Sequence, residues 1–407
     1  MSVAERGLRE EPEAPRVSAL DRITVALLER ALTSLSGGAL EVTLPDGSVR
    51  RFGEGAAASM RIRELALFRR LATRGVIGLG EGYTAGEWES DDLVGLFELL
   101  LRNAERARRS RPAILRLLEL RPRPNRRNGL LRARRNIAYH YDLGNDLFEL
   151  MLDETMTYSC AIFTEADETL ADAQRRKYRR VCEKLQLHSG DRLLEIGCGW
   201  GGFARFAAEE YGCAVTGLTI SSQQAALARE RTNGLKVFIL EEDYRLHRGS
   251  YTKIASIEML EAIGERQFVT YFSTLDRLLE EDGIACVQTI LIPDNRWERY
   301  RKSPDWIERY VFPGCLIPSL GALTRTATEG SELIIRDVDE IGPHYAETLR
   351  RWRENFHSQI GSVRALGYDA RFERTWDYYL AFCEAGFRTR ALRDVQLTLT
   401  RPYNEEL

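Results

Sequence analysis

The sequence of 407 residues carries a net charge of −3 and is 44% hydrophobic and 29% charged, which is typical of a globular protein with room for two domains. No apolar run approaches the ~20 residues that span a bilayer, and residues 1–15 lack the apolar stretch of a secretory signal. The seven cysteines include no CxxC pair and the five histidines show no ligand spacing, so the pattern excludes a structural zinc site and predicts reduced, cytoplasmic thiols.

The first third of the sequence predicts a small α+β domain. Residues 1–17 are polar and proline-containing, so we expect them to be disordered. We place the domain at residues 18–120 and expect it to associate with lipid or a membrane. Its predicted elements are a helix over 20–35, a β-hairpin over 40–52 around a Pro-Asp-Gly turn, and helices over about 64–74 and 91–104.

Residues 102–135 form the most biased stretch of the chain. They contain thirteen arginines, no lysine and two acidic residues, a local net charge of +11. Prolines and asparagines mark residues 121–135 as a basic linker. A solvated face is the simple interpretation of a charge run, but leucines and isoleucine interleave with the arginines over 114–120, as in amphipathic helices at membrane interfaces. We therefore expect an anionic membrane surface as the partner, and no nucleic-acid-binding signature occurs.

Residues 136–407 alternate predicted strands and helices, which indicates an α/β domain. We expect a Rossmann-like, mostly parallel sheet with helices on both faces. A proline- and aromatic-rich excursion over 297–319 interrupts the alternation. The predicted strands cover 193–196, 214–218, 236–240, 254–257, 284–292 and 395–399, and the predicted helices cover 171–185, 203–211, 222–232, 266–279, 345–356 and 371–387.

This domain is organised around residues 193–202, LLEIGCGWGG. The apolar run predicts a buried strand, the glycines a tight turn, and the following residues a helix. Such a turn lets the backbone approach a ligand closely and leaves helix N–H groups free to donate. The glycine spacing differs from that of dinucleotide-binding turns. With Glu195 just upstream, it resembles motif I of the S-adenosylmethionine-dependent methyltransferases.

Polar residues end the next two strands, where nucleoside-binding folds place ribose and base contacts. Thr219 and Gln224 follow the second strand, and Glu242 follows the third. Together with residues 158–160 (YSC) and 256–264 (SIEMLEAIG), they resemble the cyclopropane-fatty-acyl-phospholipid synthase family, which includes the mycolic acid cyclopropane synthases.

The resemblance covers about residues 134–402 and, more weakly, the N-terminal domain. It implies methyl transfer from S-adenosylmethionine to the double bond of unsaturated acyl chains in membrane phospholipids, giving cyclopropane or methylene-branched chains. It also implies a bicarbonate base, a homodimer, and a cytoplasmic enzyme peripheral to the inner membrane face. The implied cofactor-binding residues are Tyr158, Ser159, Glu195, Gly197, Gly199, Thr219, Ile220, Gln224 and Glu242. The implied catalytic residues are Glu261, Cys160, Gln288, Ile290 and Tyr379, and we add Glu258 as a further candidate carboxylate.

Two positions depart from the family pattern, because Ala262 and Gln288 stand where histidines are usual. Losing two imidazoles weakens the case for bicarbonate, although Gln288 can still donate a hydrogen bond to it. Glu258 lies three residues before Glu261, on the same side of a helical turn. Either carboxylate could instead remove the proton directly if burial raises its pKa; a helix N-cap or a solvated carboxylate is the alternative for Glu258. The pattern resembles the branch of the family that makes methylene-branched chains.

Several residues keep more than one interpretation. Cys160 has no base nearby in the sequence, so a backbone or packing role is favoured over a nucleophile. His140 and Tyr141 fit a lid, a cofactor contact or a structural hydrogen bond. Six aromatic residues could line an acyl tunnel and stabilise a cation or simply pack in the core: Tyr310, Phe312, Trp352, Phe356, Trp376 and Tyr378.

Two further functions compete with the lipid-modifying enzyme. A methyltransferase acting on another small molecule or on nucleic acid would need a polar substrate pocket, whereas residues 290–320 and 376–387 are apolar and aromatic. A membrane-binding module with a relict cofactor fold would be expected to have lost the polar motif residues, which are intact.

Overall fold

The computed structural model describes residues 26, 32–33, 35–109, 143–165 and 167–404. Within this part the chain forms two compact units, which divide between Asp92 and Leu93. Most of the predicted helix over 20–35, most of the arginine-rich segment, and His140 and Tyr141 lie outside the described residues. No described helix is long and apolar enough to cross a membrane.

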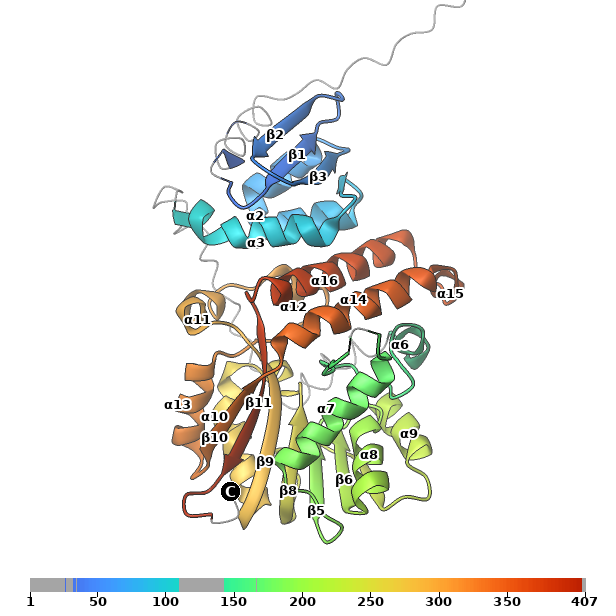
Figure 1. The fold of residues 1–407 in the computed structure, drawn as a ribbon, viewed down its shortest axis with the longest axis vertical. Coiled ribbons are helices and arrows are strands. Elements are labelled where there is room, and N and C mark those ends of the chain that lie inside the picture. The colour runs from blue at the N-terminus through green and yellow to red at the C-terminus, as the bar shows by residue number, and fades with distance from the viewer. Residues whose placement is uncertain (1–25, 27–31, 34, 110–142, 166, 405–407) are drawn as a thin grey trace, which may run out of the picture. The chain divides into compact units, whose positions relative to one another are not determined.

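The first unit is a four-stranded sheet with order β2-β1-β3-β4 and one long helix (Figure 1). The predicted hairpin is confirmed: β1 pairs antiparallel with β2, and Ser48 caps the turn by donating its backbone N–H to Asp46 Oδ1 at 2.9 Å. β3 pairs parallel with β1 and was not predicted. The elements are β1 (Ala39–Thr43), β2 (Val49–Gly53), β3 (Ala57–Ile62), α2 (Ala66–Thr84) and β4 (Trp88–Glu89).

Helix α2 runs farther than its sequence pattern predicts. The helical pattern ends near residue 74, yet the helix continues to Thr84 after a kink at Gly75, whose φ of 56° and ψ of −132° are non-helical. Glycine adopts such a conformation without the strain that a side chain would impose. After the kink, Trp88 folds back into the core and donates its indole N–H to the Leu79 carbonyl at 2.8 Å.

The second unit contains the predicted α/β sheet, with strand order β10-β11-β9-β8-β5-β6-β7. Five neighbouring strands are parallel, while β11 and β10 are antiparallel at one edge. The mostly parallel sheet is therefore confirmed. The strands are β5 (Arg192–Ile196), β6 (Ala214–Thr219), β7 (Val237–Glu241), β8 (Tyr251–Ile257), β9 (Leu279–Leu291), β10 (Ile334–Glu340) and β11 (Arg393–Thr400).

Helices cover both faces of this sheet, as predicted (Figure 1). Helices α7 (Leu170–Lys184) and α8 (Gly202–Tyr211) bury Val181 and Phe203 against one face. Helices α10 (Phe268–Leu278) and α13 (Leu320–Gly330) bury Phe272 and Leu323 against the other. Burial of this apolar surface, at about 25 cal/mol per Å², holds the strand ends in fixed positions for the site.

Helix α9 (Ser222–Arg231) packs beside β6 and β7, and most of the other helices lie at or beyond the carboxyl ends of the parallel strands (Figure 1). Helix α3 packs against α16, so it belongs to the second unit rather than to the N-terminal domain in which the sequence analysis placed it. The excursion over 297–319 contains one short helix and the end of another. These elements are α3 (Leu93–Arg109), α6 (Asn145–Met151), α9 (Ser222–Arg231), α11 (Asp294–Tyr300), α12 (Trp306–Tyr310), α14 (Gly342–Ser358), α15 (Ile360–Ala365) and α16 (Ala370–Arg388), with 3₁₀ turns at Leu260–Ala262 and Glu265–Gln267.

Candidate active site

The glycine-rich turn joins β5 to α8 as the sequence predicts. Its backbone is fixed to the next strand, because the N–H groups of Gly197 and Cys198 both donate to the Leu218 carbonyl at 2.9 Å. Gly199 has a φ of +51°, and a Cβ built there would meet nothing within 4 Å. The turn therefore presents bare backbone to an open space, and the α8 N-terminus begins directly beside it.

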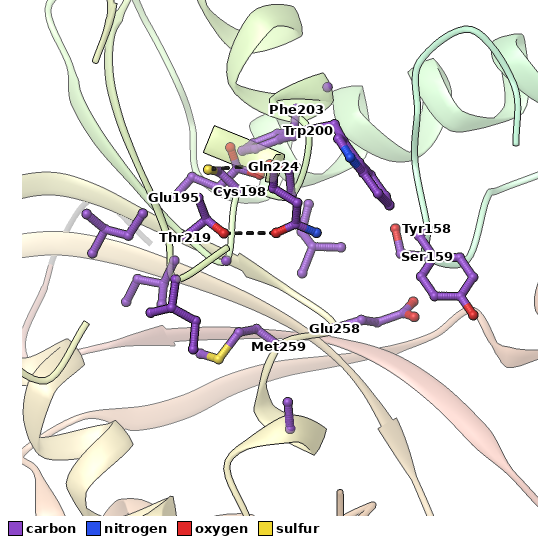
Figure 2. A pocket seen from close by; sticks show the side chains of 18 of the residues that line it. Tyr158, Ser159, Glu195, Cys198, Trp200, Phe203, Thr219, Gln224, Glu258 and Met259 are labelled. Carbon is purple, nitrogen blue, oxygen red and sulfur yellow. Dashed lines mark hydrogen bonds between the residues drawn. The ribbon is translucent and has the colours of Figure 1, made fainter. Parts of the chain in front are cut away.

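That open space is a pocket at the carboxyl ends of β5, β6 and β7 (Figure 2). All nine predicted cofactor-binding residues line it, from the loop before α7 through to the end of β7: Tyr158, Ser159, Glu195, Gly197, Gly199, Thr219, Ile220, Gln224 and Glu242. Ligands of open α/β sheets bind at this edge. The sequence motifs, which are far apart along the chain, thus converge on one cavity.

One end of the pocket carries uncharged and acidic hydrogen-bonding groups. Thr219 donates its hydroxyl to Gln224 Oε1 at 2.8 Å, which fixes the amide so that its NH₂ group faces the pocket (Figure 2). Glu242 Oε2 lies 2.7 Å from His247 Nδ1, and His247 Nε2 lies 2.7 Å from the Tyr251 hydroxyl. A ribose and a base would find donors and acceptors of defined orientation here.

Glu195 lines the pocket and is only 3% exposed. Burial raises the pKa of its carboxyl to about 8, against the opposing charge of Lys177. Within the described residues its Oε2 has no hydrogen-bond partner. A buried, unsatisfied carboxylate oxygen is costly, so the site suits a ligand that brings a donor such as an amino group.

Glu258 forms the boundary between this pocket and a second polar cluster. Its Oε1 accepts hydrogen bonds from the Cys160 backbone N–H and from Gln288 Nε2, both at 2.8 Å. Its Oε2 accepts the Tyr345 hydroxyl at 2.6 Å. Figure 2 shows the carboxylate pointing toward the loop that carries Tyr158 and Ser159. Three donors therefore hold this carboxylate at the pocket wall, and the buried side chain of Asp394 also lies against it.

The local conformation of Glu258 corrects the sequence analysis. It has a φ of 49°, in the left-handed region, and it precedes the 3₁₀ turn that begins at Leu260. Glu258 and Glu261 therefore do not share one side of a helical turn, and Glu258 is neither a helix N-cap nor a solvated carboxylate. A non-glycine residue costs about 1 kcal/mol or more in this region, and the three donors compensate for that cost.

Glu261 has a different environment from Glu258. Its Oε1 accepts the Thr289 hydroxyl at 2.8 Å and the Ile290 backbone N–H. Burial and the charge of Glu258 raise its pKa to about 7. Glu261 does not line the cofactor pocket. It links the end of β8 to the end of β9, and Ile290 takes part only through its backbone.

Two tyrosines near the site make different hydrogen bonds. Tyr379 bonds to the Tyr158 hydroxyl at 2.8 Å rather than to the carboxylates. Tyr345, which the sequence analysis treated only as a helix residue, contacts Glu258 instead. Both tyrosines are buried, on α16 and α14 respectively. The sequence holds no local signal that separates them, because the packing of two helices decides which hydroxyl reaches the cluster.

Two further residues that the sequence analysis missed lie behind Gln288. Asp394 Oδ2 accepts a hydrogen bond from Gln288 Nε2 at 3.2 Å, and Gln396 donates to Gln288 Oε1 at 3.1 Å. Asp394 is fully buried, and burial together with the charges of Glu258 and Glu261 holds its pKa well above the usual range. Polar residues inside the apolar strand β11 were the available signal.

The Cys160 thiol is shielded from solvent and donates to the Ala161 carbonyl at 3.2 Å. Burial raises its pKa well above the usual range, which opposes formation of a nucleophilic thiolate. Cys160 acts on the site through its backbone N–H. None of the six aromatic residues proposed for an acyl tunnel lines the pocket, and Trp352, Phe356, Trp376 and Tyr378 are core residues. The described residues contain no cluster suited to a metal ion.

Comparison with known proteins agrees with this geometry. The family model described as mycolic acid cyclopropane synthetase matches residues 129–397. A tuberculostearic acid methyltransferase of Mycobacterium tuberculosis is 40% identical over 403 residues, which cover 96% of this chain and 93% of that protein. The cyclopropane-fatty-acyl-phospholipid synthase of Escherichia coli K12 is 37% identical over 353 residues, 85% of this chain and 88% of that protein.

A solved structure has a similar fold. The crystal structure of the mycolic acid cyclopropane synthase CmaA1 complexed with SAH and CTAB matches with a TM-score of 0.61 and 31% identity. The match covers 66% of this chain and 98% of the crystallised one. SAH is the demethylated form of S-adenosylmethionine, so a protein similar to this chain holds the product form of that cofactor.

Proposed function

The chain belongs to the mycolic acid cyclopropane synthetase family and is an S-adenosylmethionine-dependent fatty acyl C-methyltransferase, and we propose that its substrates are unsaturated acyl chains of membrane phospholipids. Bound S-adenosylmethionine supplies an electrophilic sulfonium methyl group, which an alkene can attack only when the two are aligned and water is excluded. The tasks left to the protein are to bind the cofactor, to orient the acyl chain and to take up one proton.

The pocket described above fits the cofactor. Bare backbone at Gly199 leaves room beside the turn, and the unsatisfied Glu195 Oε2 suits the amino group of the methionine part. Thr219, Gln224 and Glu242 line the same pocket and offer hydrogen-bonding groups for the ribose and base. We therefore assign all nine lining residues predicted from the sequence to cofactor binding.

We assign the role of general base to Glu258. The observation that supports it is the identity of its donors: Cys160 and Gln288 are two of the positions at which the family would hold bicarbonate. A carboxylate has the same planar shape and charge as bicarbonate, and here the Glu258 side chain occupies the donor set itself. It also borders the cofactor pocket, whereas Glu261 does not.

Whether the product is a cyclopropane or a methylene branch depends on when one proton is lost from the methylated chain. Methylation of the double bond leaves a carbocation on the acyl chain, and Glu258 accepts a proton from the added methyl group. Ring closure at that step gives a cyclopropane, and a prior hydride shift gives a methylene branch. We propose the methylene-branched chain, because Ala262 and Gln288 depart from the histidine pattern and a similar protein is named a tuberculostearic acid methyltransferase.

The test uses purified protein, vesicles of a monounsaturated phospholipid and S-adenosylmethionine, with mass spectrometry and proton NMR of the released fatty acids. We expect each modified chain to gain one CH₂ unit and to show the vinylidene protons of a methylene group. Vesicles of a saturated phospholipid are the matched control. Cyclopropane proton signals alone would overturn the methylene assignment, and no modification of any unsaturated chain would overturn the proposed substrate.

A further inference from the structure

A fully buried lysine is left without a role by the proposal above. Lys177 lies on the buried stripe of α7, has 0% exposure and borders the cofactor pocket. Its Nζ donates to Ser159 Oγ at 2.7 Å and lies 4.6 Å from the centre of the Tyr178 ring. In the described part of the chain, ion pairs within 4.0 Å connect many lysines and arginines to acids, but none includes Lys177.

Burying an ammonium group costs several kcal/mol unless anions or acceptors surround it. An ammonium has three N–H donors, and within the described residues Lys177 Nζ makes a single hydrogen bond, to the Ser159 hydroxyl. Burial lowers the pKa of Lys177 only to about 8, because surrounding acids oppose the loss of charge. The group therefore remains largely an ammonium near neutral pH and has unused donors beside an open pocket.

Ser159 both accepts a hydrogen bond from Lys177 and borders the pocket. Its oxygen accepts from Lys177, and its backbone carbonyl accepts Gln174 Nε2 at 2.9 Å. With one lone pair taken and the backbone fixed on the other side, the Ser159 hydroxyl hydrogen is free to point into the pocket. Glu195, whose charge interacts with that of Lys177, lies in the same pocket with an unsatisfied oxygen. One buried cationic group and one buried acidic group thus border the same cavity and interact through their charges.

We propose that Lys177 and Ser159 together form the anion subsite of this pocket and bind the carboxylate of the amino acid end of the cofactor. The inference rests on the proposed function. A zwitterion has an ammonium for Glu195 and a carboxylate for Lys177, so a single ligand satisfies both buried groups. Charge-assisted hydrogen bonds of this kind are about twice as strong as neutral ones. Lys177 is then the residue that selects an amino acid end over an uncharged or amine-only one.

The experiment compares two ligands by titration calorimetry: S-adenosylmethionine and its decarboxylated analogue, which keeps the amine, the sulfonium and the nucleoside. We expect wild-type protein to prefer S-adenosylmethionine by at least about tenfold. Lys177→Met should remove that preference by weakening S-adenosylmethionine while leaving the analogue almost unchanged. Lys184→Met is the matched control, because Lys184 is on the same helix but pairs with Asp337 away from the pocket.

Each outcome has a distinct meaning. Equal weakening of both ligands in Lys177→Met, or no weakening of either, would overturn the anion subsite. Wild-type protein that binds neither ligand would overturn the proposed cofactor instead. Ser159→Ala, which is sterically mild, tests the same preference should Lys177→Met fail to fold, and it should reduce the preference in the same direction. Thermal unfolding of each variant reports whether the fold is retained.

Discussion

The Tyr345 hydroxyl donates a 2.6 Å hydrogen bond to Glu258 Oε2 and so connects helix α14 to the end of strand β8. The ring of Tyr345 stacks on Phe387 with centroids 4.5 Å apart, which fixes the hydroxyl in place. The Glu258 carboxylate, which borders the cofactor pocket, is therefore positioned by a residue of helix α14 as well as by the end of its own strand, β8.

Tyr345→Phe should lower turnover without weakening cofactor binding. The change removes one donor from a buried carboxylate, and hydrogen bonds to charged groups contribute about 1.5–3 kcal/mol, so we expect kcat to fall roughly 10- to 100-fold. Tyr379→Phe is the contrast, because that hydroxyl bonds to the cofactor-pocket residue Tyr158 and should mainly raise the KM for the cofactor. The same kinetic effect in both variants would contradict the separate positions of the two tyrosines.

Gly199→Val should abolish cofactor binding while leaving most of the fold intact. Its Cβ would enter the open space beside the turn, and its φ of +51° adds strain of about 1–2 kcal/mol. Gly212→Val controls for the strain, since Gly212 has a φ of +69° and ends α8 away from the pocket. Calorimetry with S-adenosylmethionine and thermal unfolding separate the two effects. Unchanged affinity in Gly199→Val would remove the turn from the cofactor site.

Local sequence patterns were sufficient for the hairpin and the β5–turn–α8 unit, whose glycines and apolar runs encode their own geometry. The nine residues that line the cofactor pocket came from the family resemblance, and several of them end neighbouring strands. Their convergence follows from the parallel sheet, which brings strand ends to one edge. The sequence therefore predicted which residues gather in the pocket, although the binding role of each is still a proposal.

The features that the sequence did not predict depend on contacts between residues far apart in the chain. β10 was missed because most of its residues are exposed and charged, so no apolar alternation marks it. The left-handed conformation of Glu258 had no glycine to signal it. The choice of Tyr345 over Tyr379 depends on how α14 and α16 pack. Lys177 is the exception, since its place on the apolar stripe of α7 was visible in the helical pattern.

Glu195 should make the stability of the cofactor-free protein fall as the pH rises from about 4.5 to about 8. Burial raises its folded-state pKa from 4.5 to about 8, so the folded state binds more protons than the unfolded state in that window, and the free energy of unfolding decreases with pH. The loss is up to about 5 kcal/mol, at about 1.4 kcal/mol per unit. Glu195→Gln should flatten this component, measured by denaturant unfolding across the window.

The control for that measurement is Glu209→Gln. Glu209 is exposed on α8 and pairs with Arg205, so its removal should leave the pH dependence of the wild type in place. Other buried groups also titrate, and the informative quantity is the difference between the wild-type and Glu195→Gln curves. Parallel curves for these two proteins would show that Glu195 does not carry the shift.

The arginine-rich segment should bring the enzyme to anionic bilayers. We expect co-sedimentation with vesicles containing anionic lipid, little with neutral vesicles, and weaker binding as salt rises, because surface charges are screened. Replacing Arg126, Arg127, Arg134 and Arg135 with glutamine should reduce vesicle binding more than cofactor affinity. The charge-matched control replaces exposed arginines elsewhere: Arg69, Arg266, Arg325 and Arg371. Equal, salt-insensitive binding to neutral and anionic vesicles would disprove the membrane role of residues 102–135.

The assignment of Glu258 as the base predicts chemical rescue. Glu258→Gly removes the carboxylate, suits the left-handed backbone at that position, and leaves three donors unpaired: the Cys160 N–H, Gln288 Nε2 and the Tyr345 hydroxyl. We expect turnover to fall by about 10²- to 10⁴-fold, with cofactor affinity retained. Added bicarbonate or formate should fill the vacated donor set and restore activity in a saturable manner.

Glu258→Gln provides the control for that rescue, because its amide still fills the site while being unable to accept the proton. We expect this variant to be inactive at every anion concentration. Wild-type enzyme should be indifferent to bicarbonate depletion, since its base is covalently attached. Adding the two histidines of the family pattern to the glycine variant, as Ala262→His and Gln288→His, should lower the bicarbonate concentration needed for rescue. Two results would contradict the assignment: a wild-type enzyme that stops in bicarbonate-depleted buffer, or a Glu258→Gln variant that keeps full turnover. Either result would show that a bound anion is the base and that Glu258 only helps to position it.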